Sequence, residues 1–365
     1  MLLSLSLWDE LSKESAVSAW TSLPTSVETE DALDALLTTP PPDLVEMMAR
    51  IDGDIIVLGI GGKMGLTLGV LARRAIEAAG VRKSVIGVSR FSDPMCRDTL
   101  EAQGVQTLPC DLLDRAAVDD LPRVKNVIHM VGRKFGTKGA EPLTWASNVS
   151  VPDNVGQHFR ESRLVVFSTG CVYPLVPAVS GGCTEGVAPD PVGEYAQSCL
   201  GRERVFEHWS NTFATPLCLV RLNYAIDLRY GVLYDIGKRV FEGRPIDLGV
   251  SHFNAIWQGD ANHWALRCLE HCASPANVLN VTGPETASVR FVAEAFAELF
   301  SAGVDFVGEG TDGRMYLSNA ARAIAQFGYP SVPLITMVRW QAGWIQRGGR
   351  SLDKPTHFAV VDGEY

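Results

Sequence analysis

DIIVLGIGGKMG, residues 54–65, decides the fold of this 365-residue chain. Its apolar run leads directly into a glycine-rich turn, and LTLGVLARRAIEAAG (66–80) follows with the spacing of an amphipathic helix. Similar apolar runs recur at SVIGVSR (84–90), NVIHMVG (126–132) and RLVVFSTG (163–170). Near-continuous apolar strands separated by helical segments predict an α/β fold with a doubly wound, Rossmann-like parallel sheet buried on both faces.

The glycine-rich turn has the spacing G-x-x-G-x-x-G at Gly59, Gly62 and Gly65. Glycines at a strand-to-helix turn let backbone N–H groups approach a pyrophosphate at the helix N-terminus, where a Cβ would collide. The turn, with Lys63 and Met64 inside it, therefore predicts a dinucleotide site. The alternative is a tight turn that binds no ligand.

The second strand ends at Ser89-Arg90 without a carboxylate. An acidic residue at this position accepts the adenosine ribose 2′-OH of NAD, whereas a basic one accommodates the 2′-phosphate of NADP. Arg90, with Lys63 nearby, predicts NADP as the cofactor and leaves NAD possible. An ordinary solvated surface arginine is the alternative for Arg90.

Composition excludes several classes of function. The chain is 46% hydrophobic and 20% charged, as in a globular protein, and its 32 basic and 42 acidic residues give a net charge of −10 that opposes nucleic-acid binding. The eight cysteines have no paired or zinc-type spacing, which predicts reduced thiols and no metal site. Asp9 and Glu10 interrupt the opening apolar run, and no stretch has 18 consecutive apolar residues. We therefore expect a cytoplasmic protein without a membrane segment.

The composition changes along the chain suggest four parts. Residues 1–50 form an N-terminal extension with a triple proline at 40–42, expected to be a helical arm packed on the main body or an oligomer contact. Residues 51–220 carry the Rossmann domain. A smaller α/β substrate domain comes mainly from residues 221–350, interleaved with the Rossmann domain, and residues 351–365 form a C-terminal tail of unassigned role.

Four further blocks follow the glycine turn in a fixed order: Cys110-Asp111-Leu112, Asn148-Val149, VVFSTGCVYP (165–174) and GDANHWALRCLEH (259–271). With them the chain resembles the extended short-chain dehydrogenase/reductase family, of the NAD(P)-dependent epimerase/dehydratase type, from near Asp54 to near Gly343. The resemblance implies cofactor contacts from Asp111, Leu112, Val131, Gly132 and Tyr195. It also implies a homodimer, and a sugar-like or polyhydroxylated small-molecule substrate that exchanges hydride with the nicotinamide.

The resemblance places the catalytic hydroxyl on Thr169 and the proton-exchanging phenol on Tyr195. The family pairs this tyrosine with a lysine one helical turn later, but Tyr195-Ala196-Gln197-Ser198-Cys199 carries a cysteine there. A thiol, with a reference pKa of ~8.5, supplies no fixed positive charge that would lower the tyrosine pKa.

Three explanations for the missing lysine stay open. A cation after the strand at 126–132 replaces it (Arg133, Lys134 or Lys138), or Tyr195 acts only as a proton donor in carbonyl reduction. In the third, the chain binds NAD(P) with impaired catalysis and acts as a sensor or scaffold.

Substrate contacts are expected from residues after the catalytic blocks. Cys171 follows the candidate hydroxyl, Arg229 and Tyr230 occupy an expected mobile loop, and Trp257 belongs to a polar and aromatic cluster suited to stacking on a ring. Plain packing for Trp257 and solvation for Arg229 are the alternatives. Arg221 is equally a substrate residue or a structural ion-pair partner.

Overall fold

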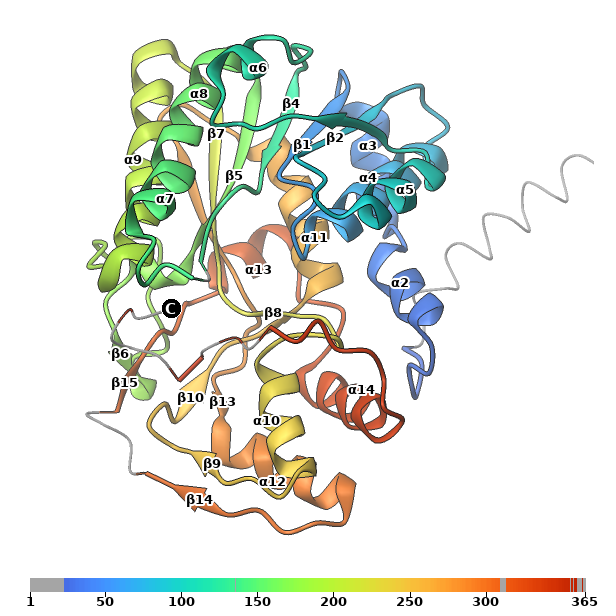
Figure 1. Cartoon of the computed structure of the whole chain (residues 1–365), viewed down its shortest axis with the longest axis vertical. Coiled ribbons are helices and arrows are strands. Elements are labelled where there is room, and N and C mark those ends of the chain that lie inside the picture. The colour runs from blue at the N-terminus through green and yellow to red at the C-terminus, as the bar shows by residue number, and fades with distance from the viewer. Residues whose placement is uncertain are drawn as a thin grey trace, which may run out of the picture.

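The computed structural model describes residues 23–134, 136–308, 313–354, 356, 358–359 and 363. A sheet-bearing part lies above a smaller part in Figure 1. The sheet has seven parallel strands in the order β12-β7-β5-β4-β1-β2-β3. The strands are β1 (Ile55–Leu58), β2 (Val85–Ser89), β3 (Gln106–Pro109), β4 (Asn126–His129), β5 (Arg163–Thr169), β7 (Leu217–Leu222) and β12 (Asn277–Val281). The predicted doubly wound sheet is confirmed.

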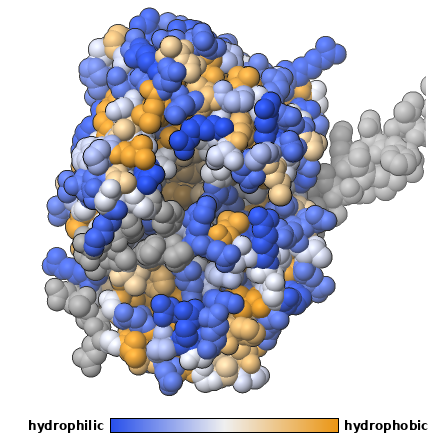
Figure 2. Space-filling model, in the orientation of Figure 1, coloured by the Kyte–Doolittle hydropathy of each residue, from blue (hydrophilic) through white to orange (hydrophobic). Residues whose placement is uncertain are grey.

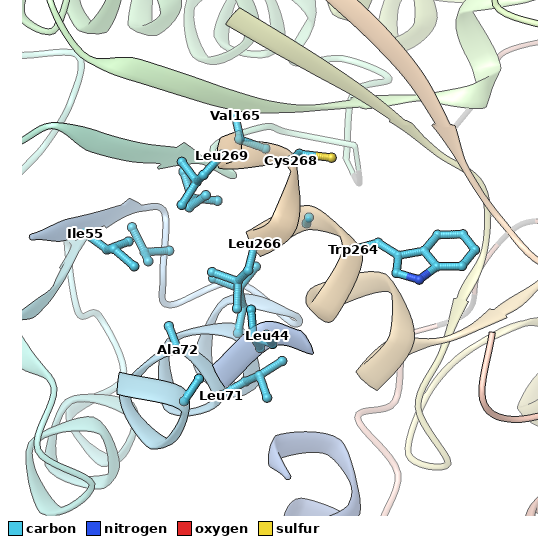
Figure 3. Packing of buried hydrophobic residues seen from close by; sticks show 14 of the residues in the cluster. Leu44, Ile55, Leu71, Ala72, Val165, Trp264, Leu266, Cys268 and Leu269 are labelled. Atoms are coloured by element: carbon cyan, nitrogen blue, oxygen red, sulfur yellow. The ribbon is translucent and has the colours of Figure 1, made fainter. Parts of the chain in front are cut away.

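Both faces of this sheet are buried. Along β1, Ile55 and Val57 belong to one apolar cluster and Ile56 and Leu58 to another, and all four are fully buried. Helices α3 (Pro42–Arg50), α4 (Gly65–Ala78) and α11 (Gln258–Arg267) pack on the first face, and Figure 3 shows Leu44, Leu71 and Leu266 of these helices together with Ile55 of β1. Helices α8 (Val151–His158) and α9 (Gly193–Phe213) pack on the second face. Burial on both faces explains why the strands read as continuous apolar runs.

The helices of the sheet-bearing part lie mostly between its strands in the sequence, whereas α3 precedes β1 and α13 follows β12. They are α3 (Pro42–Arg50), α4 (Gly65–Ala78), α5 (Pro94–Ala102), α6 (Arg115–Asp119), α7 (Glu141–Trp145), a π-helical turn (Ala146–Ser150), α8 (Val151–His158), α9 (Gly193–Phe213), α11 (Gln258–Arg267) and α13 (Ala321–Phe327), with 3₁₀ turns at Gly170–Val172, Ala178–Ser180 and Cys268–His271. In the described part of the chain no helix combines the length and apolar character needed to cross a membrane.

The smaller part has its own core, with Phe296, Trp340 and Trp344 fully buried in it. Its helices are α10 (Val232–Phe241), α12 (Val289–Phe300) and α14 (Leu334–Gln346). Short strand pairs complete the chain: β9 (Ile246–Asp247) with β14 (Phe306–Val307), β10 (His252–Phe253) with β13 (Ala287–Ser288), β8 (Ala225–Ile226) with β11 (Ile256–Trp257), and β6 (Val176–Pro177) with β15 (Arg314–Met315).

The described residues of the N-terminal extension contribute to both cores. Helix α3 buries Leu44 and Met47 with the sheet, whereas α2 (Glu30–Thr38) buries Leu33 and Leu37 in the smaller part. Asp43 in the first turn of α3 also pairs with α11, 2.6 Å from the Arg267 guanidinium. Helices α2 and α3 of residues 23–50 thus pack on the main body, and residues 1–22 lie outside the described residues.

The site follows from the sheet topology. β1 has β2 on one side and β4 on the other, so the strand order reverses there, and in such sheets ligands bind in the crevice outside the carboxyl ends of the strands. These ends face the smaller part, and Figure 2 shows that the surface is hollowed between the two parts.

Candidate functional site

The turn between β1 and α4 requires its glycines. Gly59 has φ +86°, and a Cβ there would lie 2.9 Å from Val131 Cγ2. A Cβ at Gly65, where α4 begins, would lie 2.4 Å from the Ile60 carbonyl oxygen. A Cβ at Gly62, which lines the adjoining cavity, would meet only the Gly59 carbonyl oxygen, at 3.3 Å, apart from its chain neighbours.

A cavity of about 440 Å³ adjoins the turn on the side of β2 and β3. Five of the candidate cofactor contacts outside the turn line it: Arg90, Asp111, Leu112, Val131 and Gly132. The end of β2 contributes Ser89, Arg90 and Ser92 to this lining, and these three residues include no carboxylate. This cavity therefore has the position and chemistry to hold the adenosine half of a dinucleotide.

A second cavity of about 420 Å³ lies on the side of β5 and β7. Its lining includes six further sequence-predicted residues: Lys63, Met64, Thr169, Cys171, Tyr195 and Tyr230. The two cavities share Gly59, Gly61, Gly62, Met130, Gly132 and Lys134. A nicotinamide dinucleotide fits this arrangement, because its pyrophosphate would cross the glycine turn and its two halves would occupy the two cavities.

Thr169 and Tyr195 meet in the second cavity. Thr169 ends β5, Tyr195 lies in the first turn of α9, and their side chains are hydrogen-bonded. Burial, followed by the neighbouring Cys199 and Cys171 thiols, raises the pKa of Tyr195 well above its ordinary value. Tyr195 is therefore a neutral phenol at neutral pH.

Cys199 does not replace the family's lysine as a cation. Burial raises the pKa of its thiol to about 11, so the thiol is neutral. Of the three candidate cations after β4, only Lys134 lines the cavity with Tyr195: its Nζ lies 5.7 Å from the centroid of that ring and interacts electrostatically with Cys199. Arg133 instead lines the adenosine-side cavity and donates to the Gly136 carbonyl at 3.0 Å.

A second cation, Arg202, was missed by the sequence reasoning. It lies seven residues after Tyr195, two turns along the same face of α9, and its charge lowers the pKa of Tyr195. Its guanidinium is buried and donates to the Phe167 carbonyl (2.8 Å) and to Asn148 Oδ1 (2.7 Å) in the π-helical turn. The i, i+7 spacing from Tyr195 was the signal that could have found it.

Arg221 is a structural ion-pair partner. Its guanidinium bonds both Glu203 oxygens, at 2.9 and 2.7 Å, with the two side chains 4% and 0% exposed. Ser168 Oγ also donates to Glu203, at 2.6 Å. The pair thus ties α9 to the ends of β5 and β7, next to Thr169.

Two predicted substrate residues lie elsewhere. Arg229 pairs with Asp227 and with Asp34 of the N-terminal extension, both at 2.9 Å, which turns its charge away from the lining of the second cavity. Trp257 is 2% exposed and packs against Trp340 with ring centroids 5.4 Å apart, so plain packing describes it. Residues that sequence reasoning left unassigned, Asn223, Tyr224, Gln258, Lys354 and Thr356, line the cavity instead.

The parallel sheet and the glycine turn at its switch point define a Rossmann-type dinucleotide-binding protein. Residues 55–225 match the model of the NAD dependent epimerase/dehydratase family. The resemblance seen in the sequence is confirmed, and the family is one of enzymes.

Solved structures extend the likeness of fold to about four-fifths of the chain. The chain is similar to a UDP-galactose 4-epimerase (TM-score 0.63, 19% identity, 81% of this chain and 99% of that one). It is also similar to the UDP-glucose 4-epimerase of Thermus thermophilus in complex with NAD (0.64, 19%, 80% and 99%) and to the dTDP-glucose 4,6-dehydratase of Bacillus anthracis in complex with NAD (0.67, 15%, 80% and 96%).

Two mycobacterial proteins match a shorter part of the chain. One is a phenolphthiocerol synthesis polyketide synthase type I of Mycobacterium bovis, 36% identical over 112 residues. The other is a Mycobacterium tuberculosis synthase of the same type that is described as inactive, 37% identical over 112 residues. Each match covers 27% of this chain, and the chain spans only 5% and 7% of the length of these synthases.

Proposed function

We propose that this protein is an NAD(P)-dependent oxidoreductase or epimerase that acts on a sugar-like or polyhydroxylated carbonyl or alcohol. The observation that carries the proposal is the hydrogen-bonded Thr169–Tyr195 pair, placed in a cavity that continues into a dinucleotide-sized cleft. The structural neighbours support the choice of substrate, since their names describe epimerases and a dehydratase of nucleotide sugars.

The protein's residues have separate roles in this proposal. A bound nicotinamide supplies hydride exchange. Thr169 orients the substrate oxygen, and Tyr195 donates its phenolic proton to that oxygen. Because Tyr195 is protonated at neutral pH, carbonyl reduction is the favoured direction. The Lys134 ammonium stabilises the phenolate that proton donation leaves, in place of the lysine that position 199 lacks.

The test measures cofactor oxidation or reduction with a panel of sugars and their keto forms. The absorbance of the reduced nicotinamide is the readout. We expect turnover with at least one keto sugar, faster in the reductive direction. Tight cofactor binding without turnover of any member would contradict the proposal and favour the sensor or scaffold alternative. A homodimer and a cytoplasmic location stay predictions.

Arg90 is expected to select NADPH. A charge-assisted hydrogen bond to the 2′-phosphate corresponds to about 1.5–3 kcal/mol, so Arg90→Ala is expected to weaken NADPH binding by about 10- to 100-fold and NADH binding by less than about twofold. Titration by nicotinamide fluorescence measures both affinities. Arg97→Ala is the matched control, because Arg97 is an exposed arginine on α5 that pairs with Glu101. Equal losses for the two cofactors would refute the assignment.

A further inference from the structure

Three lysines gather around the candidate reaction centre. The whole chain contains eight lysines and has a net charge of −10, yet Lys63, Lys134 and Lys354 line the one cavity that holds Thr169 and Tyr195. The mechanism above uses only Lys134. Lys63 also belongs to the predicted dinucleotide turn, and Lys354 has no role in that mechanism.

The three lysines reach the cavity from three distant segments. Lys63 comes from the glycine turn, and its Nζ lies 3.4 Å from the centroid of the Tyr230 ring. Lys134 follows β4 and donates to the Thr356 carbonyl at 3.4 Å. Lys354 comes from the C-terminal segment, which runs from α14 across the space between the two parts of the molecule (Figure 1).

Hydrogen bonds hold the C-terminal segment in this place. Thr356 donates to Asp235 Oδ2 on α10 through its backbone N–H (2.8 Å) and its hydroxyl (2.5 Å). The Leu352 N–H donates to the Arg229 carbonyl at 3.0 Å. Lys354 lies between Leu352 and Thr356, so these hydrogen bonds hold its segment beside the cavity.

The lysines repel one another. Burial, together with the charges of Lys354 and Lys134, lowers the pKa of Lys63 to about 7, and Asp235 offsets only part of this effect. Like charges gathered in a partly buried site cost free energy, which an anionic ligand placed among them would offset.

We propose that the substrate carries an anionic group, a carboxylate or a phosphate, close to the carbonyl that reacts at Tyr195, and that Lys63 and Lys354 bind it together with Lys134. This inference rests on the proposed oxidoreductase function and specifies its substrate. The position of Lys354 separates this anion from the cofactor's pyrophosphate, because Lys354 comes from the C-terminal segment, lines the Tyr195 side of the cleft and is absent from the lining of the adenosine-side cavity.

The test measures binding to the full chain saturated with NADPH, so that the cofactor's own phosphates already occupy their places. Glucose, glucuronate and glucose 6-phosphate are the probes, titrated by calorimetry, and the two charged sugars distinguish a carboxylate from a phosphate. We expect one charged sugar to bind at least about tenfold more tightly than glucose. We expect Lys354→Gln to remove most of that preference without changing NADPH affinity. Lys63→Gln is expected to remove the preference as well, but Lys63 lies in the glycine turn, so Lys354→Gln is the variant that separates substrate binding from cofactor binding.

Lys238→Gln is the matched control, since Lys238 lies on α10, pairs with Glu242 and does not line this cavity. Equal binding of the three sugars, or a charged-sugar preference that survives in both lysine variants, would overturn the anion site. A loss of NADPH affinity in both variants would overturn it as well, because the lysines would then serve the cofactor. A lysine-dependent preference without turnover of any substrate would contradict the oxidoreductase function and leave the anion site standing.

Discussion

Replacing Tyr195 by phenylalanine is expected to lower turnover by about 10²- to 10⁴-fold, the usual contribution of a positioned proton donor. The phenyl ring keeps the packing of Tyr195 and removes only the hydroxyl that bonds Thr169. Cofactor affinity and the unfolding temperature are therefore expected to change little. Steady-state kinetics with a substrate from the sugar panel, and fluorescence titration with NADPH, measure the two effects. Unchanged turnover would remove Tyr195 from the mechanism.

The pH dependence gives a second readout for Tyr195. Its pKa lies well above the ordinary value, so the phenol keeps its proton through neutral and mildly alkaline solution. The reductive rate should therefore not fall between about pH 7 and pH 9 through loss of this proton. The oxidative rate needs the deprotonated oxygen and should rise over the same range. Lys63, with a pKa lowered to about 7, also titrates in this cavity, so the test uses Lys63→Gln: a reductive rate that still falls with an apparent pKa near 7 in this variant would contradict the assignment of Tyr195 as proton donor.

Lys134→Met separates the role of Lys134 from that of Tyr195. If the ammonium stabilises the phenolate left after proton donation, kcat is expected to fall by about tenfold, and the oxidative rate should then rise only at higher pH. Arg133→Met is the control, since Arg133 is the preceding residue and lines the other cavity. Equal kinetics for the two variants would show that Tyr195 needs no cation. The second explanation for the missing lysine would then hold, in which Tyr195 acts only as a proton donor.

The sheet and the cofactor half of the cleft were predictable because their signals are local. Continuous apolar runs marked four of the seven strands, and the glycine spacing marked the turn where a Cβ at Gly65 would collide with the Ile60 carbonyl. The positions of Arg90 and Asp111 follow once the strands are in order. Each of these inferences uses the chain within a few residues of the feature that it predicts.

The substrate half was less predictable because long-range contacts decide it. Arg229 looked like a loop residue exposed to substrate, but Asp34, almost two hundred residues earlier, approaches its guanidinium. Trp257 looked suited to stacking, but the core of the smaller part contains it. Lys354 gave no local signal at all, since the hydrogen bonds from Thr356 to Asp235 place its segment. Tertiary packing of this kind is not encoded in a short window of sequence.

The second large effect is expected at Glu203. Glu203→Gln keeps the shape of the side chain but leaves the Arg221 guanidinium buried without a countercharge, which is expected to cost about 3–5 kcal/mol of the free energy of unfolding. Glu207→Gln is the matched control on the same helix, because Glu207 pairs with the exposed Arg204 and should contribute less than about 1 kcal/mol. Urea unfolding followed by circular dichroism measures both variants.

Activity and stability should change together at Glu203, because this carboxylate also accepts the Ser168 hydroxyl beside Thr169. A loosened end of β5 would misplace the Thr169 hydroxyl relative to Tyr195, so turnover is expected to fall under conditions where Glu203→Gln is still folded. The double replacement Glu203→Leu with Arg221→Met removes both charges and should recover much of the lost stability, since it leaves no unpaired buried charge. It cannot recover the Ser168 hydrogen bond, so its turnover should stay low. A double variant with full turnover would show that the ion pair supports the fold and has no part in positioning Thr169.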